Sequence, residues 1–313
     1  MLAIALGIVR CVIGSDAASD VASTDVASTA GPSQSACTAA AARAAHLIVD
    51  EAPPIFTDEL AAAILGDQAD YFIGFHRAHG THPVLSGARA QVTCRSRYTE
   101  DCLARRVRGG VTQYVILGAG LDSFGYRSAL AGQVRVFEVD HPATQRWKRQ
   151  QLAAARIPVP GSVTFVPADL EAEPLADCLT RCGFDHHSQA LVSWLGVTMY
   201  LSRQAIGQTL AVIGDFAPGS ELIADYMLPA GLRDAAGDAY ARAIMPVSAE
   251  RGEPWLSLLA PSEMSSLLED SGLGQVEHVR QRDAVSAELW DRSDSLRPAG
   301  LSQLARAIVL PRR

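Results

Sequence analysis

The stretch from Val111 to Asp140 constrains the fold of this chain more than any other. It has the order strand, glycine turn, helix, strand, and it closes on acidic residues; its parts are Tyr114–Leu117, Gly118-Ala119-Gly120, Val134–Phe137, Glu138 and Asp140. That order is typical of the nucleotide-binding half of a doubly wound α/β fold. Glycines let the backbone turn sharply and approach a ligand closely. An acidic side chain at the tip of the second strand can accept hydrogen bonds from ribose hydroxyls.

The spacing after the turn narrows the class of ligand. A dinucleotide fingerprint has a third glycine three residues after the second, and Ser123 stands at that position instead. Lys148 is the only lysine of the chain, so a catalytic Tyr-x-x-x-Lys pair is absent too. A turn without a diphosphate cradle suits a nucleoside ligand that carries no phosphate, such as S-adenosyl-L-methionine. We prefer this interpretation to a glycine turn that merely ends a strand.

Composition excludes several classes of function. Of the 313 residues, 48% are hydrophobic and 19% charged, which supports a large buried core. The net charge of −7 comes without a basic run, so nucleic acid is not an expected partner. The apolar start, Met1–Gly14, is too short to span a membrane and lacks the charged n-region that is typical of a secretory signal. The six cysteines form no Cys-x-x-Cys pair and are expected to be reduced thiols of a cytoplasmic protein.

The chain is expected to divide into a leader and one domain. Residues 1–34 contain a direct repeat, Asp20–Thr24 and Asp25–Thr29, and are predicted to be a low-complexity, disordered leader. Residues 35–110 are predicted to form a helical cap, in which Val84–Arg108 is the longest helix. Residues 111–313 are predicted to form a Rossmann-like core. The cap precedes the first strand and can therefore cover the open end of the sheet, where a ligand at the strand tips would lie.

Further strands alternate with helices, which predicts a parallel sheet whose last two strands form an antiparallel edge pair. The remaining strands are expected at Val163–Val166, Ala190–Trp194, Glu221–Tyr226, Val276–Val279 and Ala305–Leu310. Within the cap, Thr57 is expected to begin a helix over Asp58–Leu65. The histidines at 76, 79 and 82 are interpreted as a helix end running into a turn, because no second ligand cluster accompanies them, and no metal is expected.

Two later segments follow predicted strands and are candidates for the site. Asp169 follows the third strand, where its carboxylate can accept a hydrogen bond from an adenine amino group or can cap a helix. The spacing leaves both readings open. The loop Leu195–Leu201 follows the fourth strand, so it also lies at the end of the sheet where a ligand binds.

These motifs together resemble the bacterial S-adenosylmethionine-dependent methyltransferases of the leucine carboxyl methyltransferase-like group, which includes polyketide O-methyltransferases. The matching segments are Arg95-Ser96-Arg97-Tyr98, Glu100-Asp101, Ile116–Ser123, Tyr126-Arg127, Phe137–Asp140, Ala168-Asp169-Leu170 and Met199-Tyr200-Leu201. The resemblance runs from about Ser35 to the C-terminus. It implies a doubly wound, seven-stranded class I methyltransferase sheet, Rossmann-like, with an N-terminal helical cap and S-adenosyl-L-methionine as methyl donor.

The resemblance also implies roles for individual residues. Arg95 would pair with the methionyl carboxylate of the donor, and Asp140 would bind its ribose. The other residues expected to bind the cofactor are Gly118, Ala119, Gly120, Glu138, Asp169 and Leu170. Leu195 departs from the family, since many members carry a glutamate early in that loop, and this departure favours a different substrate. Leu195 and Tyr200 are the candidates on the substrate side, and the catalytic residues are unassigned.

The expected reaction is O-methylation of a small molecule, either on a carboxylate or on a hydroxyl, in a setting such as secondary metabolism. A carboxylate acceptor needs no base, whereas a hydroxyl needs one. Two other functions stay open at this stage. One is a nicotinamide-dependent oxidoreductase, and the other is a protein that binds S-adenosyl-L-methionine without catalysis. The oligomeric state cannot be derived from the sequence.

Overall fold

The computed structural model describes residues 33–311, and these residues contain a mixed sheet of seven strands in the order β3-β2-β1-β4-β5-β7-β6. The strands are β1 (Gln113–Leu117), β2 (Arg135–Asp140), β3 (Val163–Pro167), β4 (Ala190–Trp194), β5 (Glu221–Met227), β6 (Leu273–Arg280) and β7 (Ser302–Val309). The first five are parallel, and β7 runs antiparallel to both β5 and β6. The predicted doubly wound sheet with an antiparallel edge pair is therefore confirmed.

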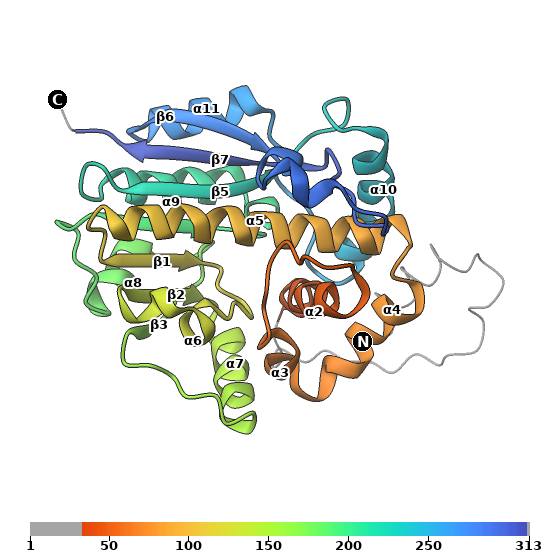
Figure 1. Ribbon diagram of the computed structural model, residues 1–313. Coiled ribbons are helices and arrows are strands. Elements are labelled where there is room, and N and C mark those ends of the chain that lie inside the picture. Colours follow the sequence, from red (N-terminus) through yellow and green to blue (C-terminus); the bar gives the residue numbers. More distant parts are fainter. Residues whose placement is uncertain (1–32, 312–313) are drawn as a thin grey trace.

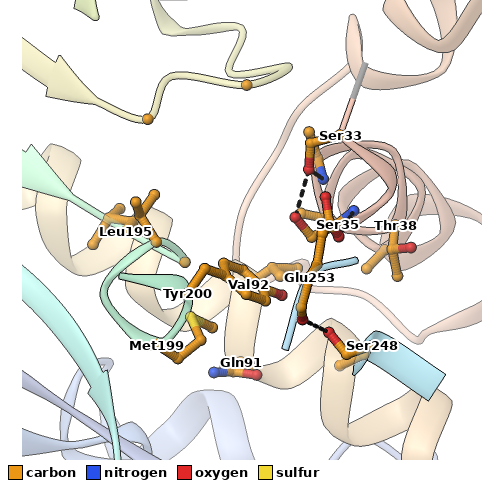
Figure 2. A pocket seen from close by; sticks show the side chains of 18 of the residues that line it. Ser33, Ser35, Thr38, Gln91, Val92, Leu195, Met199, Tyr200, Ser248 and Glu253 are labelled. Carbon is orange, nitrogen blue, oxygen red and sulfur yellow. Dashed lines mark hydrogen bonds between the residues drawn. The ribbon is translucent and has the colours of Figure 1, made fainter. Parts of the chain in front are cut away.

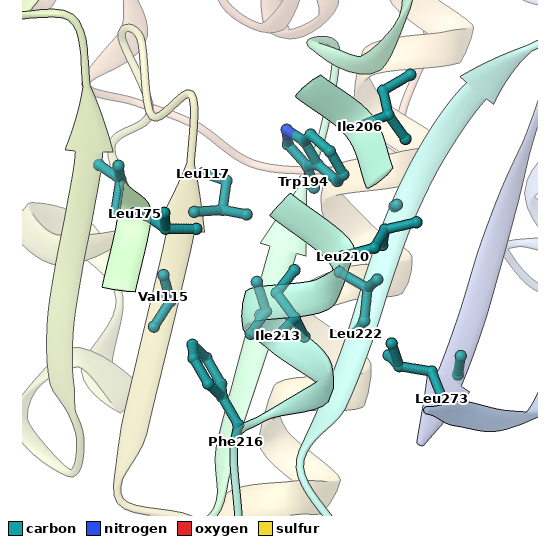
Figure 3. Close-up of a cluster of buried hydrophobic side chains, with 14 of the residues drawn as sticks. Val115, Leu117, Leu175, Trp194, Ile206, Leu210, Ile213, Phe216, Leu222 and Leu273 are labelled. Carbon is teal, nitrogen blue, oxygen red and sulfur yellow. The ribbon is translucent and has the colours of Figure 1, made fainter. Parts of the chain in front are cut away.

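Helices cover both faces of this sheet (Figure 1). Along β1, Val115 and Leu117 point to one face, and Tyr114 and Ile116 point to the other, as strand alternation requires. The first face packs against helices that follow the strands in βα order. These are α8 (Leu175–Arg181), α9 (Arg203–Gly214) and α11 (Pro261–Asp270). Figure 3 shows this cluster, in which Trp194 of β4 is fully buried.

The opposite face is crossed by a single long helix, α5 (Pro83–Arg108), which runs the length of the sheet in Figure 1. Its buried residues pack on the strands together with α6 (Phe124–Arg127). The helix begins at His82, whose side chain accepts the Val84 N–H, and Pro83 occupies the first helical position. The helix ends at Arg108, with Gly109 as its C-cap, so its predicted extent is confirmed to within one residue.

Three more α-helices precede α5 in the part of the chain that the structure describes, and they pack on one another as a separate apolar cluster. They are α2 (Gln34–Val49), α3 (Ala61–Leu65) and α4 (Ala69–His79). The cluster also includes Leu152 of α7 (Pro142–Ala154), the helix that follows β2. Figure 1 places α2, α3 and α4 beyond the ends of the strands. Helix α10 (Ala235–Glu250) contacts α5 near this end, where the Tyr240 ring faces Gly87.

One predicted helix begins later than expected. The helix over Asp58–Leu65 is α3, and it starts at Ala61 rather than after Thr57. The reason is that the Asp58 side chain is buried and paired. Its carboxylate accepts hydrogen bonds from Arg43 Nε at 2.7 Å and from the Leu60 N–H at 3.2 Å. This pairing turns the chain before the helix can begin.

The predicted leader falls almost entirely outside the described residues. Its last two positions are exceptions, because Ser33 caps α2 by accepting the Ala36 N–H, and Gln34 is the first residue of that helix. Between residues 33 and 311, none of the helices is both long enough and apolar enough to cross a lipid bilayer.

Candidate active site

A cavity of about 590 Å³ lies at the carboxyl ends of β1, β2, β4 and β5. Its remaining walls come from α2, α4, α5 and α10 and from the segment that joins α10 to the next helix. In a doubly wound sheet, this end of the strands is where ligands bind, because the loops there diverge from the sheet. The cavity is large enough for a nucleoside-sized ligand together with a second small molecule.

The predicted glycine turn forms the floor of this cavity. Gly118 and Gly120 both have positive φ angles, 63° and 48°, which side-chain-bearing residues rarely adopt. A Cβ atom on Gly118 would lie 2.3 Å from Val197 Cγ2, so the turn packs directly on the loop after β4. Ala119 N–H donates to the Val139 carbonyl at 3.0 Å and ties the turn to β2. These contacts hold the turn in place where it lines the cavity.

Asp140 lines the cavity beside the turn, at the end of β2. One carboxylate oxygen accepts the Gly120 N–H, and the other accepts the His141 N–H at 2.6 Å. Burial raises the pKa of this carboxyl group, and the two backbone N–H groups oppose that rise. A carboxylate has about four lone-pair sites, so Asp140 keeps capacity for a ligand.

Arg95 of α5 lines the cavity from the opposite side of the turn, and an ion pair holds its guanidinium there. Its Nη1 atom donates to Asp225 Oδ2 at 2.7 Å, and the other oxygen of Asp225 accepts the Gly196 N–H at 2.6 Å. Arginine has five N–H donors, so this arrangement leaves others for a ligand. Asp225 lies at the end of β5 and is buried.

The substrate-side candidates Leu195 and Tyr200 both line the cavity. Figure 2 shows Tyr200 beside Met199, with Glu253 lying between it and Ser35 of α2. Glu253 accepts the Ser35 N–H at 3.1 Å and so links the segment after α10 to the start of α2. Burial raises the pKa of the Tyr200 phenol, and the charge of Glu253 raises it further. Tyr200 is therefore a hydrogen-bond donor at neutral pH.

Three predicted cofactor residues do not line this cavity: Glu138, Asp169 and Leu170. The prediction for Glu138 is corrected, because its carboxylate is fully buried beneath α7. There it accepts hydrogen bonds from Lys148 Nζ at 2.7 Å and from the Tyr126 hydroxyl at 3.0 Å. That pairing makes Glu138 part of the core. Asp169 follows β3 and is half-buried; its side chain accepts the Glu171 N–H at 2.9 Å, which is a local turn bond. Leu170 packs against the apolar cluster beside α8.

Several lining residues were not identified from the sequence. His76, Gln91, Glu253 and Tyr240 come from four different parts of the chain and meet at this cavity. None belongs to a strand–turn motif, so no local signal marks them. The interpretation of the histidines as a helix end is confirmed, since α4 ends at His79 and His82 begins α5. Within residues 33–311, no three His, Cys, Asp or Glu side chains are grouped as a metal site would require.

The fold and the site together define a class I, Rossmann-like methyltransferase. Solved structures of the same fold include a provisionally named methyltransferase from Thermobifida fusca YX, with a TM-score of 0.57 and 18% identity, covering 90% of this chain and 97% of that one. A DUF574 family protein from Streptomyces avermitilis MA-4680 has a TM-score of 0.56 and 15% identity, covering 86% and 97% of the two chains. At these identities the likeness establishes the fold.

Sequence relatives establish the family. The family described as leucine carboxyl methyltransferase matches residues 36–214, more than half of the chain. YktD of Bacillus subtilis (strain 168), provisionally named an S-adenosyl-L-methionine-dependent methyltransferase, is 34% identical over 204 residues, which are 64% of this chain and 67% of YktD. Rv3787c of Mycobacterium tuberculosis (strain ATCC 25618 / H37Rv), similarly named, is 35% identical over 155 residues, 49% of each protein. The match thus spans about half the length of the mycobacterial relative.

The chain belongs to the leucine carboxyl methyltransferase family, and it is an enzyme of the S-adenosyl-L-methionine-dependent class. The resemblance found in the sequence is therefore confirmed.

Proposed function

We propose that this enzyme transfers the methyl group of S-adenosyl-L-methionine to an oxygen of a small molecule, either a carboxylate or a hydroxyl. The observation that carries the proposal is that an anionic hydrogen-bond acceptor, Asp140, and a cation, Arg95, line one cavity together with the glycine turn. Asp140 ends β2, and Arg95 lies beside Gly196, which follows β4; these strands flank β1, which leads into the turn. A donor with a ribose at one end and an amino-acid carboxylate at the other matches both side chains. We also propose a cytoplasmic location and a role in secondary metabolism.

The roles of the cofactor residues follow from this placement. Asp140 accepts hydrogen bonds from the ribose hydroxyls with the lone pairs that Gly120 and His141 leave open. Arg95 binds the methionyl carboxylate with the donors that Asp225 leaves open. Gly118, Ala119 and Gly120 give the donor close access to the backbone. Asp169 and Leu170 follow β3 outside the lining of the cavity, and we keep the prediction that they contact the adenine.

Bound S-adenosyl-L-methionine supplies an electrophilic methyl group on a positively charged sulfur. The protein contributes alignment and the exclusion of water, and positioning alone can lower the barrier by about 7–11 kcal/mol. The wall that faces the acceptor suits this task, because it is mainly apolar: Phe72, Val92, Met199, Met227 and Ile244 contribute to it. A dry wall of this kind favours transfer in line with the sulfur–carbon bond and keeps water from competing.

The two acceptor chemistries make different demands on the site. A carboxylate is already ionised at neutral pH and needs no base. A hydroxyl needs one, and Glu253 is the side chain on this wall that can accept the proton, since Tyr200 is held protonated. Leu195 and Tyr200 lie on the acceptor side of the turn and would shape which molecule enters. Family membership favours a methyltransferase over the nicotinamide oxidoreductase and the non-catalytic binding protein.

The test has two stages. Calorimetry with S-adenosyl-L-homocysteine and with reduced nicotinamide dinucleotide establishes the cofactor, and only the first should bind. Transfer of radiolabelled methyl from the donor is then screened on small carboxylic acids and phenols. Mild alkali releases methanol from a methyl ester but not from a methyl ether, so the labelled product identifies the acceptor oxygen. Nicotinamide binding without binding of the homocysteine compound would contradict the proposal.

A further inference from the structure

His76 of α4 is a wall residue of the cavity that the proposed mechanism does not use. It is buried, with 3% of its surface exposed, and it lies among apolar lining residues. Its Nδ1 atom is 3.1 Å from Arg89 Nη1. Arginine can only donate, so Nδ1 must accept, and the proton of the neutral imidazole must be on Nε2. Among the described residues, no hydrogen-bond acceptor is paired with Nε2.

A buried ion pair holds this arrangement in place behind His76. Arg89 is completely buried; its Nε and Nη2 atoms donate to the two oxygens of Asp50 at 2.7 and 2.8 Å, and Nη2 also donates to the Gly80 carbonyl at 2.8 Å. His46 in turn contacts Asp50 through its Nδ1 atom at 2.9 Å. Three hydrogen bonds to Asp50 and Gly80 thus hold the guanidinium, and within residues 33–311 its Nη1 atom is paired with the ring of His76. The hydrogen bond from Arg89 therefore fixes the tautomer of His76, with the proton on Nε2.

The surroundings also keep His76 uncharged. Burial and the nearby charge of Arg89 together lower the pKa of the imidazole to about 3, although Asp50 opposes the change. A ring whose only lone pair is occupied and whose protonated form is disfavoured cannot serve as a general base. What it can offer the cavity is one N–H donor that lies among apolar lining residues.

We propose that His76 binds the methyl acceptor through its Nε2–H group, and that the acceptor is a mainly apolar molecule bearing a carbonyl or carboxylate oxygen that meets this donor. The inference rests on the proposed function, since it deepens the description of the acceptor. The apolar body would lie against the neighbouring wall, which includes Phe72, Phe75, Val84, Leu85 and Ala88. His76 therefore selects the acceptor by hydrogen bonding and takes no proton from it.

The tautomer can be tested without knowing the acceptor. Protein labelled with ¹⁵N-histidine is studied by long-range ¹H–¹⁵N correlation, and the signals of His76 are assigned by their loss in His76→Gln. The expected pattern is that of an Nε2–H imidazole with an unprotonated Nδ1. A pattern with the proton on Nδ1, or a charged ring at neutral pH, would overturn the inference.

The contact with the acceptor is tested with 4-phenylbutanoate as the probe and butylbenzene as its counterpart without an oxygen, both added to the complex with S-adenosyl-L-homocysteine. The carboxylate should shift the Nε2 signal of His76, and the hydrocarbon should not. His76→Phe keeps the ring volume but removes the donor, and should weaken probe binding by at least about tenfold. His76→Gln keeps a donor and an acceptor and should bind the probe nearly as the parent does. A probe that shifts nothing, or that binds His76→Phe like the parent, contradicts the proposal.

His79→Gln is the matched control, because His79 lies on the same helix and does not line the cavity. It should leave binding of the probe unchanged. Binding of S-adenosyl-L-homocysteine should be the same in all variants, and it separates the two proposals. If the parent does not bind that compound, the proposed function fails; if it binds and only the His76 results disagree, this inference alone fails.

Discussion

Arg95 and Asp225 are separated by 130 residues in the chain, and their side chains form an ion pair of 2.7 Å at the edge of the cavity. Arg95 comes from the long helix α5 and Asp225 from the end of β5. The same Asp225 also accepts the Gly196 N–H from the loop after β4, at 2.6 Å. The Asp225 carboxylate thus connects helix α5, the end of β5 and the loop after β4. It holds the Arg95 guanidinium, to which we assign binding of the cofactor's carboxylate.

Replacement of Asp225 by asparagine should weaken binding of S-adenosyl-L-homocysteine by about tenfold, because a charge-assisted contact contributes about 1.5–3 kcal/mol and the amide cannot hold Arg95 as firmly. Calorimetry measures the affinity, and thermal unfolding reports whether the fold is kept. Asp101→Asn is the matched control, since Asp101 pairs with Arg97 on the exposed surface of the same helix. Equal affinities for parent and Asp225→Asn would show that Arg95 needs no such support.

Gly196 should not tolerate a side chain. Its φ angle is 75°, and a Cβ atom would lie 2.5 Å from Arg95 Nη2. Gly196→Ala is therefore expected to displace Arg95 and to lower cofactor affinity at least about tenfold, with a loss of stability of about 1–3 kcal/mol from backbone strain. Gly207→Ala is the comparison, because Gly207 lies in helix α9 with open space around it. It should raise stability by about 0.5–1 kcal/mol. A Gly196→Ala variant that binds normally would disprove the close packing.

Asp140→Ala should weaken binding of S-adenosyl-L-homocysteine by at least about tenfold, since the ribose loses a charged acceptor worth about 1.5–3 kcal/mol. The variant should stay folded, because the freed Gly120 and His141 N–H groups lie at the cavity edge. Calorimetry and circular dichroism on one preparation test both statements. Asp177→Ala changes an exposed carboxylate on α8 and should behave as the parent. If Asp140→Ala binds equally well, the ribose assignment is wrong.

The buried pair of Lys148 and Glu138 should behave as a unit. Both side chains are 1% exposed, and they are 2.7 Å apart. Lys148→Met leaves a buried carboxylate without its cation and should reduce the free energy of unfolding by about 3–5 kcal/mol. Adding Glu138→Leu to the same chain should recover most of that loss. Urea unfolding measures both, and Glu263→Gln in the exposed pair with Arg203 should cost less than about 1 kcal/mol. No recovery in the double variant would mean that Tyr126, which also donates to Glu138, matters more.

His76 should make the protein less stable in mild acid. Its pKa is lowered from 6.5 to about 3 by burial and by Arg89, so between these values the unfolded chain binds one more proton than the folded one. The contribution is fully present above the unfolded pKa and is lost as the pH falls, at up to about 1.4 kcal/mol per pH unit. The free energy of unfolding is measured with urea at about pH 7 and at about pH 5. Between these two pH values it should fall by about 2 kcal/mol more in the parent than in His76→Gln. The control His187→Gln replaces an exposed histidine and should follow the parent. Parallel pH profiles for parent and His76→Gln would contradict the prediction.

Local pattern was sufficient to predict the sheet and the turn. Strand-forming runs, the Gly118–Gly120 turn and the acidic residue at the second strand tip are signals within a few residues, and each is found where it was predicted. Helix starts depend on equally local signals, since Ser202 caps α9 and Pro142 occupies the first position of α7. The exception was α3, where Asp58 forms a buried pair with Arg43 that no local pattern contains.

What the sequence by itself determined is therefore the order of the elements and the end of the sheet at which a ligand binds, since both depend on short-range periodicity and turn chemistry. Only the tertiary structure decided which acidic residue faces the cavity: Asp140 does, whereas α7 places Lys148 over Glu138 and draws that carboxylate into the core. It also decided the partners of Arg95 and His76. These depend on how α4 and α5 pack across the strand ends, because contacts between residues far apart in the chain form only when whole elements are docked.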